Sequence, residues 1–281
     1  MQNRVREWKC ESSQFMRVLW YTVRKNGKRQ KKCAPTSEAQ QKVNERNKAR
    51  HLSDLIHLNF TPDDIAVHPT YEDRFLPASW EEHQTNLRNF VRRLKRAWAK
   101  KTGKNSKEFR YILVAAKSES GRAHAHMIVS GGRTEREIAS VWGMGYVNRR
   151  QLEFNESGLI GLANYIIKKK ERVFKRSFST SKNLEKPDPD QKNDYKITNR
   201  DARHVDENPL DYAFIEEKYP GWSVAWVNPT AETMDEEEDG QKNQHPFGRF
   251  IEIMLYRTDN QYFKRDAKGR ITYDWAKEFE N

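Results

Sequence analysis

The feature that most constrains the fold is a long amphipathic helix expected over residues 79–101. Ser79 followed by Glu81 and Glu82 is typical of a capped helix start, and Gly103 is typical of a helix end. Apolar residues recur at helical spacing between these signals, at Leu87, Phe90, Val91, Leu94, Ala97 and Trp98. A helix with one apolar face needs a second layer of structure to cover it.

The segments around this helix predict that layer. Residues 65–71 are expected to form a strand that ends near Pro69, because proline cannot donate to a sheet. Further along, the pattern predicts strands over 109–116 and 123–130 joined as a hairpin, a short helix over 135–142 capped by Thr134, a strand over 145–154 and a helix over 157–172. Strand, long helix, hairpin, short helix, strand is the ferredoxin-like (RRM-like) order. We therefore expect an α+β fold with a central antiparallel sheet backed by helices.

The chain divides into three regions by composition. Residues 1–59 are a basic N-terminal extension, with a strand expected over 15–23, a basic arm over 24–32 and a helix over 39–58. Residues 60–175 form the expected α+β domain. Residues 176–281 form a C-terminal region with a polar linker over 177–194, an acidic run over 235–239 expected to be disordered, and late strands over 247–256 and 261–273.

Charge is distributed unevenly along the chain. The first 180 residues carry 37 Lys and Arg against 18 Asp and Glu, whereas the chain as a whole has a net charge of +12. A basic segment of this kind indicates a polyanionic partner, most commonly nucleic acid, although a merely solvated basic face remains an alternative. No run of about 18 apolar residues occurs, so we expect no membrane span. Cys10 and Cys33 predict neither a zinc site nor a disulfide framework, which fits a reducing cytoplasm.

Two histidines mark a candidate metal site. His124 and His126 flank Ala125 in a segment expected to be a strand, so their side chains project from the same face. Two imidazoles at this spacing can bind one divalent metal, and Glu119 can supply a third, carboxylate ligand. The simpler alternative is a pair of half-exposed histidines at a strand edge.

A second motif lies on the helix expected over 157–172. Tyr165 and Lys168 are three residues apart, so they are neighbours on one helix face. Alone, this pair is more often a tyrosine at the edge of a core beside a surface lysine. Attack of a phenol oxygen on a phosphodiester, however, needs a nucleophile, a Lewis acid and nearby positive charge. Tyr165, a histidine-bound metal and Lys168 would supply one each.

This combination resembles the HUH endonucleases, specifically the rolling-circle replication initiators of small bacterial plasmids and single-stranded DNA phages. The resemblance implies His124 and His126 as ligands of Mg²⁺ or Mn²⁺, Glu119 as a third ligand, Tyr165 as the nucleophile and Lys168 as its partner. It also implies a nicked strand with a 5′-phosphotyrosine and a free 3′-hydroxyl that primes synthesis. Residues 65–71 look like the first motif of that family, from which His68 and Pro69 depart.

Further details follow from the same resemblance. Residues 179–184 and 209–222 also look like downstream stretches of bacterial initiators. The positions four residues from Tyr165 are Gly161 and Lys169, so we expect the single-tyrosine class. The partner would be single-stranded or origin DNA in the cytoplasm of a bacterial host. The basic residues expected to contact it are Arg92, Arg93, Arg96, Arg122, Lys169 and Lys170.

The chain has no P-loop motif for ATP, so we expect it to use a host helicase and a host polymerase. Three alternatives remain. A transposase or relaxase of the same superfamily would use the same residues. A histidine-triad nucleotide hydrolase would want a third alternate histidine, but that position is Ile128. A non-catalytic nucleic-acid-binding module would want stacking aromatics on its central strands.

Overall fold

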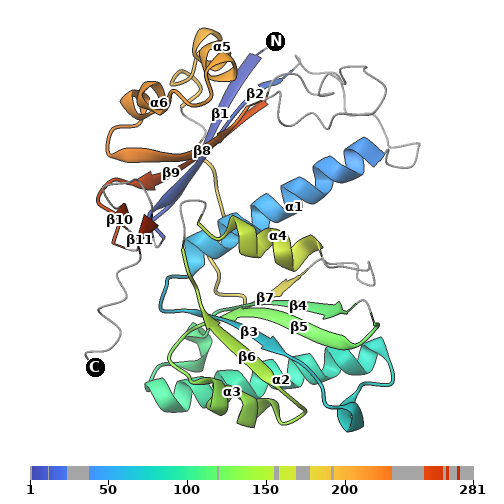
Figure 1. Cartoon of the computed structure of the whole chain (residues 1–281). Helices are drawn as coiled ribbons and strands as arrows, with labels where there is room; N and C mark the ends of the chain where they lie inside the picture. The colour runs from blue at the N-terminus through green and yellow to red at the C-terminus, as the bar shows by residue number, and fades with distance from the viewer. Residues whose placement is uncertain are drawn as a thin grey trace. The chain divides into compact units, whose positions relative to one another are not determined.

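The computed structural model groups the chain into two compact units (Figure 1). It describes residues 2–11, 13–23, 38–118, 120–154, 158–168, 178–190, 193–229, 250–261, 264–265 and 271–272. The inner unit comprises Val43–Glu153 and Leu159–Lys186, and the terminal unit comprises Met1–Lys42, Phe154–Gly158 and Pro187–Asn281. The inner unit is therefore inserted between the two ends of the terminal unit. The division of the sequence into three regions at residues 59 and 175 stays a prediction.

The inner unit has the ferredoxin-like order expected from the sequence. Its elements are β3 (Ile65–Pro69), α2 (Trp80–Thr102), β4 (Tyr111–Lys117), β5 (Ala123–Val129), α3 (Glu135–Trp142) and β6 (Val147–Gln151). The strands lie in the order β6-β3-β5-β4-β7, and every pair of neighbours is antiparallel. Each strand–helix–strand connection therefore skips one position, which the intervening strand fills. The α+β fold class with an antiparallel sheet backed by helices is confirmed.

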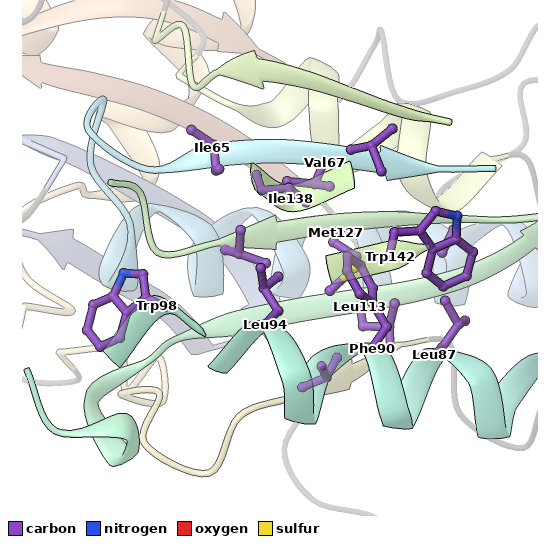
Figure 2. Close-up of a cluster of buried hydrophobic side chains, with 14 of the residues drawn as sticks. Ile65, Val67, Leu87, Phe90, Leu94, Trp98, Leu113, Met127, Ile138 and Trp142 are labelled. Atoms are coloured by element: carbon purple, nitrogen blue, oxygen red, sulfur yellow. The ribbon is translucent and has the colours of Figure 1, made fainter. Parts of the chain in front are cut away.

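The two faces of this sheet have different roles. Odd-numbered residues such as Ile65, Val67 and Met127 point to the face covered by α2 and α3, where they contact Phe90 and Trp142 in a buried core (Figure 2). Even-numbered residues point to the other face, where α4 (Ile160–Lys168) and the inner unit's part of α1 (Glu38–Asn59) lie (Figure 1). Strand alternation thus separates one face that packs from another that is available for function.

Local signals place the helix ends well. The Ser79 hydroxyl accepts the N–H of Glu82 at 3.1 Å, and Gly103 ends α2 in the left-handed conformation. Thr134 caps α3 in a capping box with Glu137. The predicted starts and ends of α1, α2 and α3 are confirmed to within one residue. The strand expected over 145–154 is shorter, since β6 covers only Val147–Gln151.

One segment of the inner unit corrects the sequence-based interpretation. The polar stretch over 177–194 was expected to be a linker, but it contains the two-residue strand β7 (Ser179–Thr180), which pairs with the edge of β4. The N–H of Tyr111 also donates to the Ser181 hydroxyl at 3.1 Å. Polar side chains here satisfy a sheet edge. Two short 3₁₀ turns, η1 (Asp73–Phe75) and η2 (Ser106–Glu108), complete this unit.

The terminal unit is a second antiparallel sheet with helices on one face. Its strands lie in the order β1-β2-β9-β8, and helices α5 and α6 contribute Val205 and Ile215 to a core shared with Val18 and Ile253. The bounds are β1 (Gln2–Cys10), β2 (Phe15–Val23), α5 (Asn199–Glu207), α6 (Tyr212–Lys218), β8 (Trp222–Asn228) and β9 (Phe250–Arg257). The pattern predicted β2 and β9 but missed β1, α5, α6 and β8.

Other expectations for the ends of the chain have mixed outcomes. The late strands expected over 261–273 are two short ones, β10 (Lys264–Arg265) and β11 (Ile271–Thr272). The basic arm over 24–32 and the acidic run over 235–239 lie outside the described residues. Among the described residues, no helix is both long and apolar enough to cross a membrane.

Gly145 fixes the entry to β6, and its replacement tests this part of the fold. A Cβ at Gly145 would collide with the carbonyl oxygen of Thr70 and lie 2.6 Å from the nitrogen of Glu72, and φ is +149°. We expect Gly145→Ala to lower the free energy of unfolding by about 2 kcal/mol or more in urea denaturation. In the matched control Gly161→Ala, the new Cβ meets no atom within 4 Å, so stability should rise by about 0.5–1 kcal/mol. Equal effects of the two changes would contradict this account of β6.

Candidate metal centre and nucleophile

Strand register brings three histidines together on one sheet face. Val67 of β3 lies opposite Met127 of β5, and the same antiparallel register places the next residue, His68, opposite His126. Directly opposed residues point to the same face with their Cβ atoms about 5 Å apart. His124 is two residues from His126 and shares that face. The third histidine therefore comes from the neighbouring strand.

The three imidazoles are close enough to bind a single ion. The ring centroids of His68 and His126 are 4.4 Å apart, and those of His68 and His124 are 5.0 Å apart. One nitrogen from each ring lies within 4.8 Å of the others. Two nitrogens bound to one ion at about 2.1 Å lie at most about 4.2 Å apart, so shifts of a few tenths of an ångström complete the site. His124 and His126 are buried, with 9% and 6% of their surface exposed. The residues present fit a divalent metal.

Sequence reasoning missed His68 as a ligand and placed Glu119 in that role. Glu119 lies outside the described residues, so its role as a ligand stays a prediction. In the part of the chain that the structure describes, the third group beside His124 and His126 is His68. The signal was present in the alternation of β3, where His68 falls on the face opposite the buried Ile65 and Val67.

A buried hydrogen-bonded chain holds the backbone of His124 from the core side. The imidazole of His83 lies 3.1 Å from the carbonyl oxygen of His124 through Nε2 and 2.9 Å from the Tyr71 hydroxyl through Nδ1. Burial lowers the pKa of His83 to about 4, and burial likewise raises the pKa of Tyr71 to about 12. Both groups are therefore neutral near pH 7, so Tyr71 donates to His83 and His83 donates to His124. This chain fixes the strand position from which the ligand projects.

A second contact sets the tautomer of His124. Its Nδ1 lies 3.3 Å from the carbonyl oxygen of Arg122. Because a carbonyl oxygen only accepts, Nδ1 carries the hydrogen and Nε2 keeps the lone pair that a metal needs. Arg122 itself is held at the hairpin: its guanidinium pairs with Asp73 at 2.6 Å and donates to the carbonyl oxygen of Tyr71 at 3.0 Å.

Helix α4 places Tyr165 over the histidine face. The ring centroid of Tyr165 is 5.3 Å from that of His126, edge to face, and 45% of the tyrosine surface is exposed. Both residues line a cavity of about 630 Å³. Its other lining residues come from β3, β5, β6 and α4: Ala66, Val67, His68, Met127, Asn148, Arg150, Gly161, Leu162 and Ile166. This lining contains no carboxylate, so the cavity suits an anionic ligand.

The remaining predicted site residues lie in several places. Lys168 is the last residue of α4, but its side chain lies outside the described part of the chain, as do Lys169 and Lys170. Arg92, Arg93 and Arg96 lie on α2, which covers the sheet face opposite the histidines. There, Arg93 donates to the carbonyl oxygens of residues 141 and 142 at the end of α3. The structure therefore does not bring these three arginines to the cavity, and their role in DNA binding stays a prediction.

Comparison with known proteins agrees with this site. Residues 66–170, which run from β3 through α4, match a family model described as replication-associated protein, of the ORF2 type. This range contains all three histidines and Tyr165. No curated protein and no solved structure matches the chain at a meaningful level of similarity. The family match supports a replication-initiator role.

Metal binding can be tested without any assay of activity. A ligand that binds only the folded protein, at a hundred times its Kd, stabilises the fold by about 2.7 kcal/mol. We expect Mn²⁺ to raise the melting temperature, EDTA to reverse the rise, and Mg²⁺ to act more weakly because it prefers oxygen ligands. His68→Ala should abolish the Mn²⁺ response, whereas the control His51→Ala, an exposed histidine on α1, should keep it. A full response in His68→Ala would remove this residue from the ligand set.

Proposed function

We propose that this chain is a rolling-circle replication initiator that nicks and rejoins single-stranded DNA through Tyr165. The observation that carries the proposal is the position of Tyr165 beside His126, over a cluster of three histidines in a cavity without carboxylates. A phenol next to a metal-binding cluster is the arrangement that attack on a phosphodiester requires. The family match over 66–170 adds independent support.

The chemistry is divided between the metal ligands and the nucleophile. His68, His124 and His126 would hold a divalent ion, which when bound acts as a Lewis acid on a non-bridging phosphate oxygen. The phenol oxygen of Tyr165 forms a bond to phosphorus while the bond from phosphorus to the 3′-oxygen breaks. The phenol loses its proton, and the departing 3′-oxygen gains one. The products are a 5′-phosphotyrosine and a free 3′-hydroxyl.

The reaction is reversible because the phosphodiester is exchanged for another phosphoester. A 3′-hydroxyl held in the same place can attack the phosphotyrosine and restore the strand. A hydrolase that used water as its nucleophile would not retain this bond. Strand joining as well as strand cutting is therefore part of the proposed activity, which makes the protein both an endonuclease and a strand transferase.

The basic residues and partners complete the proposal. Lys168 follows Tyr165 by three residues on α4, so we assign it the stabilisation of negative charge on the phosphate. The chain lacks a P-loop motif, and strand separation would fall to a host helicase and synthesis to a host polymerase in the bacterial cytoplasm. A transposase or relaxase would share this chemistry, but the matching family is described as replication-associated.

Replacement of the nucleophile tests the mechanism. We expect the protein with Mn²⁺ and a single-stranded origin oligonucleotide to give a shifted protein–DNA band on a denaturing gel. Tyr165→Phe should lose this band but keep DNA binding, because the change removes one oxygen and little volume. The control Tyr195→Phe alters an exposed tyrosine, 73% exposed, in the terminal unit and should keep the band.

Two results would contradict the proposal. An adduct that persists in Tyr165→Phe and maps by mass spectrometry to Tyr146 would show that the nucleophile is another residue. Cleavage without any adduct would show that water is the nucleophile, and the proposed activity would then be wrong.

A further inference from the structure

Strand β6 and the residue before it carry three polar or aromatic side chains along the edge of the histidine face. Asn148 lies opposite His68, and Arg150 lies opposite Ala66. Tyr146 continues this alternation one step before the strand, since its carbonyl oxygen accepts the N–H of Thr70 at 2.8 Å. Opposed residues point to the same face, so all three side chains lie on the face that carries the histidines. At about 3.3 Å per residue, the row is about 13 Å long.

These side chains are available for a ligand. Tyr146 is 71% exposed, and Asn148 and Arg150 are also exposed. Within the described part of the chain, none of the three side chains makes a hydrogen bond or an ion pair. Asn148 and Arg150 line the same cavity as Tyr165, so the row is continuous with the candidate site.

The backbone beneath this row is rigid. Gly145 approaches the strand so closely that a Cβ would collide with Thr70, and this contact fixes where Tyr146 leaves the sheet. A large aromatic side chain that is exposed on a fixed backbone loses little conformational entropy when it binds. Chance exposure of a mobile loop residue does not describe this tyrosine.

The outer edge of β6 does not favour addition of another strand. The backbone N–H of Arg149 points away from β3 and donates to the carboxylate of Glu135 at 2.9 Å. A partner that added as a β-strand would need that N–H. Recognition at this edge is therefore expected to occur through the side chains on the histidine face.

We propose that this row is the track that binds the single-stranded DNA beside the scissile phosphate. Tyr146 stacks on an unpaired base, Asn148 bonds to a base edge, and Arg150 binds a backbone phosphate. An aromatic group next to a cation is the combination with which proteins bind single strands. The row spans about four nucleotides of a stacked strand at about 3.4 Å each. This assignment rests on the proposed function.

The test measures binding separately from cleavage. Fluorescence anisotropy with a labelled, mixed-sequence single-stranded oligonucleotide in EDTA reports binding alone. Loss of one base–aromatic stack costs about 1–3 kcal/mol, so we expect Tyr146→Ala to raise Kd by about tenfold. Tyr146→Phe keeps the ring and should bind like the unmodified protein. The control Tyr195→Ala removes an equally exposed tyrosine from the terminal unit and should also leave Kd unchanged.

Arg150 has a separate signature. Removal of one phosphate contact should reduce the slope of log K against log salt by about 0.7 for a single strand. Arg150→Ala should show this reduction. Arg136→Ala removes the same charge from an exposed position on α3, which covers the opposite sheet face, and should not.

The outcomes separate this inference from the proposed function. If Tyr146→Ala and Arg150→Ala melt normally and bind DNA like the unmodified protein, the track is wrong even if the Tyr165 adduct still forms. If the unmodified protein binds no single-stranded DNA, both the track and the proposed function are wrong. Weaker binding in the two variants, with normal melting and unchanged controls, would support the track.

Discussion

The antiparallel register between β3 and β5 is the constraint on which the inner unit depends. The same pairing places Val67 and Met127 in the core on one face and His68 and His126 in the cavity on the other. A slip of one residue would exchange these faces for β3 and bury an imidazole against apolar side chains. The hydrophobic core therefore fixes the register, and the register assembles the candidate metal centre without any separate cost in folding.

The parts of the structure that local chemistry determines were predictable from the sequence. Helices α2 and α3 begin at Ser79 and Thr134, whose side chains bond to the first turn, and these caps are visible in the sequence itself. His124 and His126 share a face because of strand alternation alone. The ferredoxin-like order also follows from the sequence of local elements, since few antiparallel arrangements connect them without crossing.

Pairings between distant residues could not be predicted in the same way. His68 joins the site only through its register with His126, 58 positions later in the chain, and a single sequence contains no direct record of that pairing. The terminal unit combines β2 with β9, which are separated by the whole inner unit. Charge counts have the same limit: they show that α2 is basic but not that its arginines lie on the face opposite the histidines.

The electrostatic design of the cavity explains why a polyanion is its natural ligand. Imidazole ligands are neutral, so three histidines would leave the charge of a divalent ion uncompensated, whereas carboxylate ligands would cancel it. Arg150 adds a further positive charge to the described lining, and no carboxylate there offsets it. Exposure of the guanidinium to water keeps the cost of this imbalance low while the site is empty. A phosphodiester that enters the cavity supplies the missing negative charge and displaces that water, so the attraction is strongest where bond cleavage would occur.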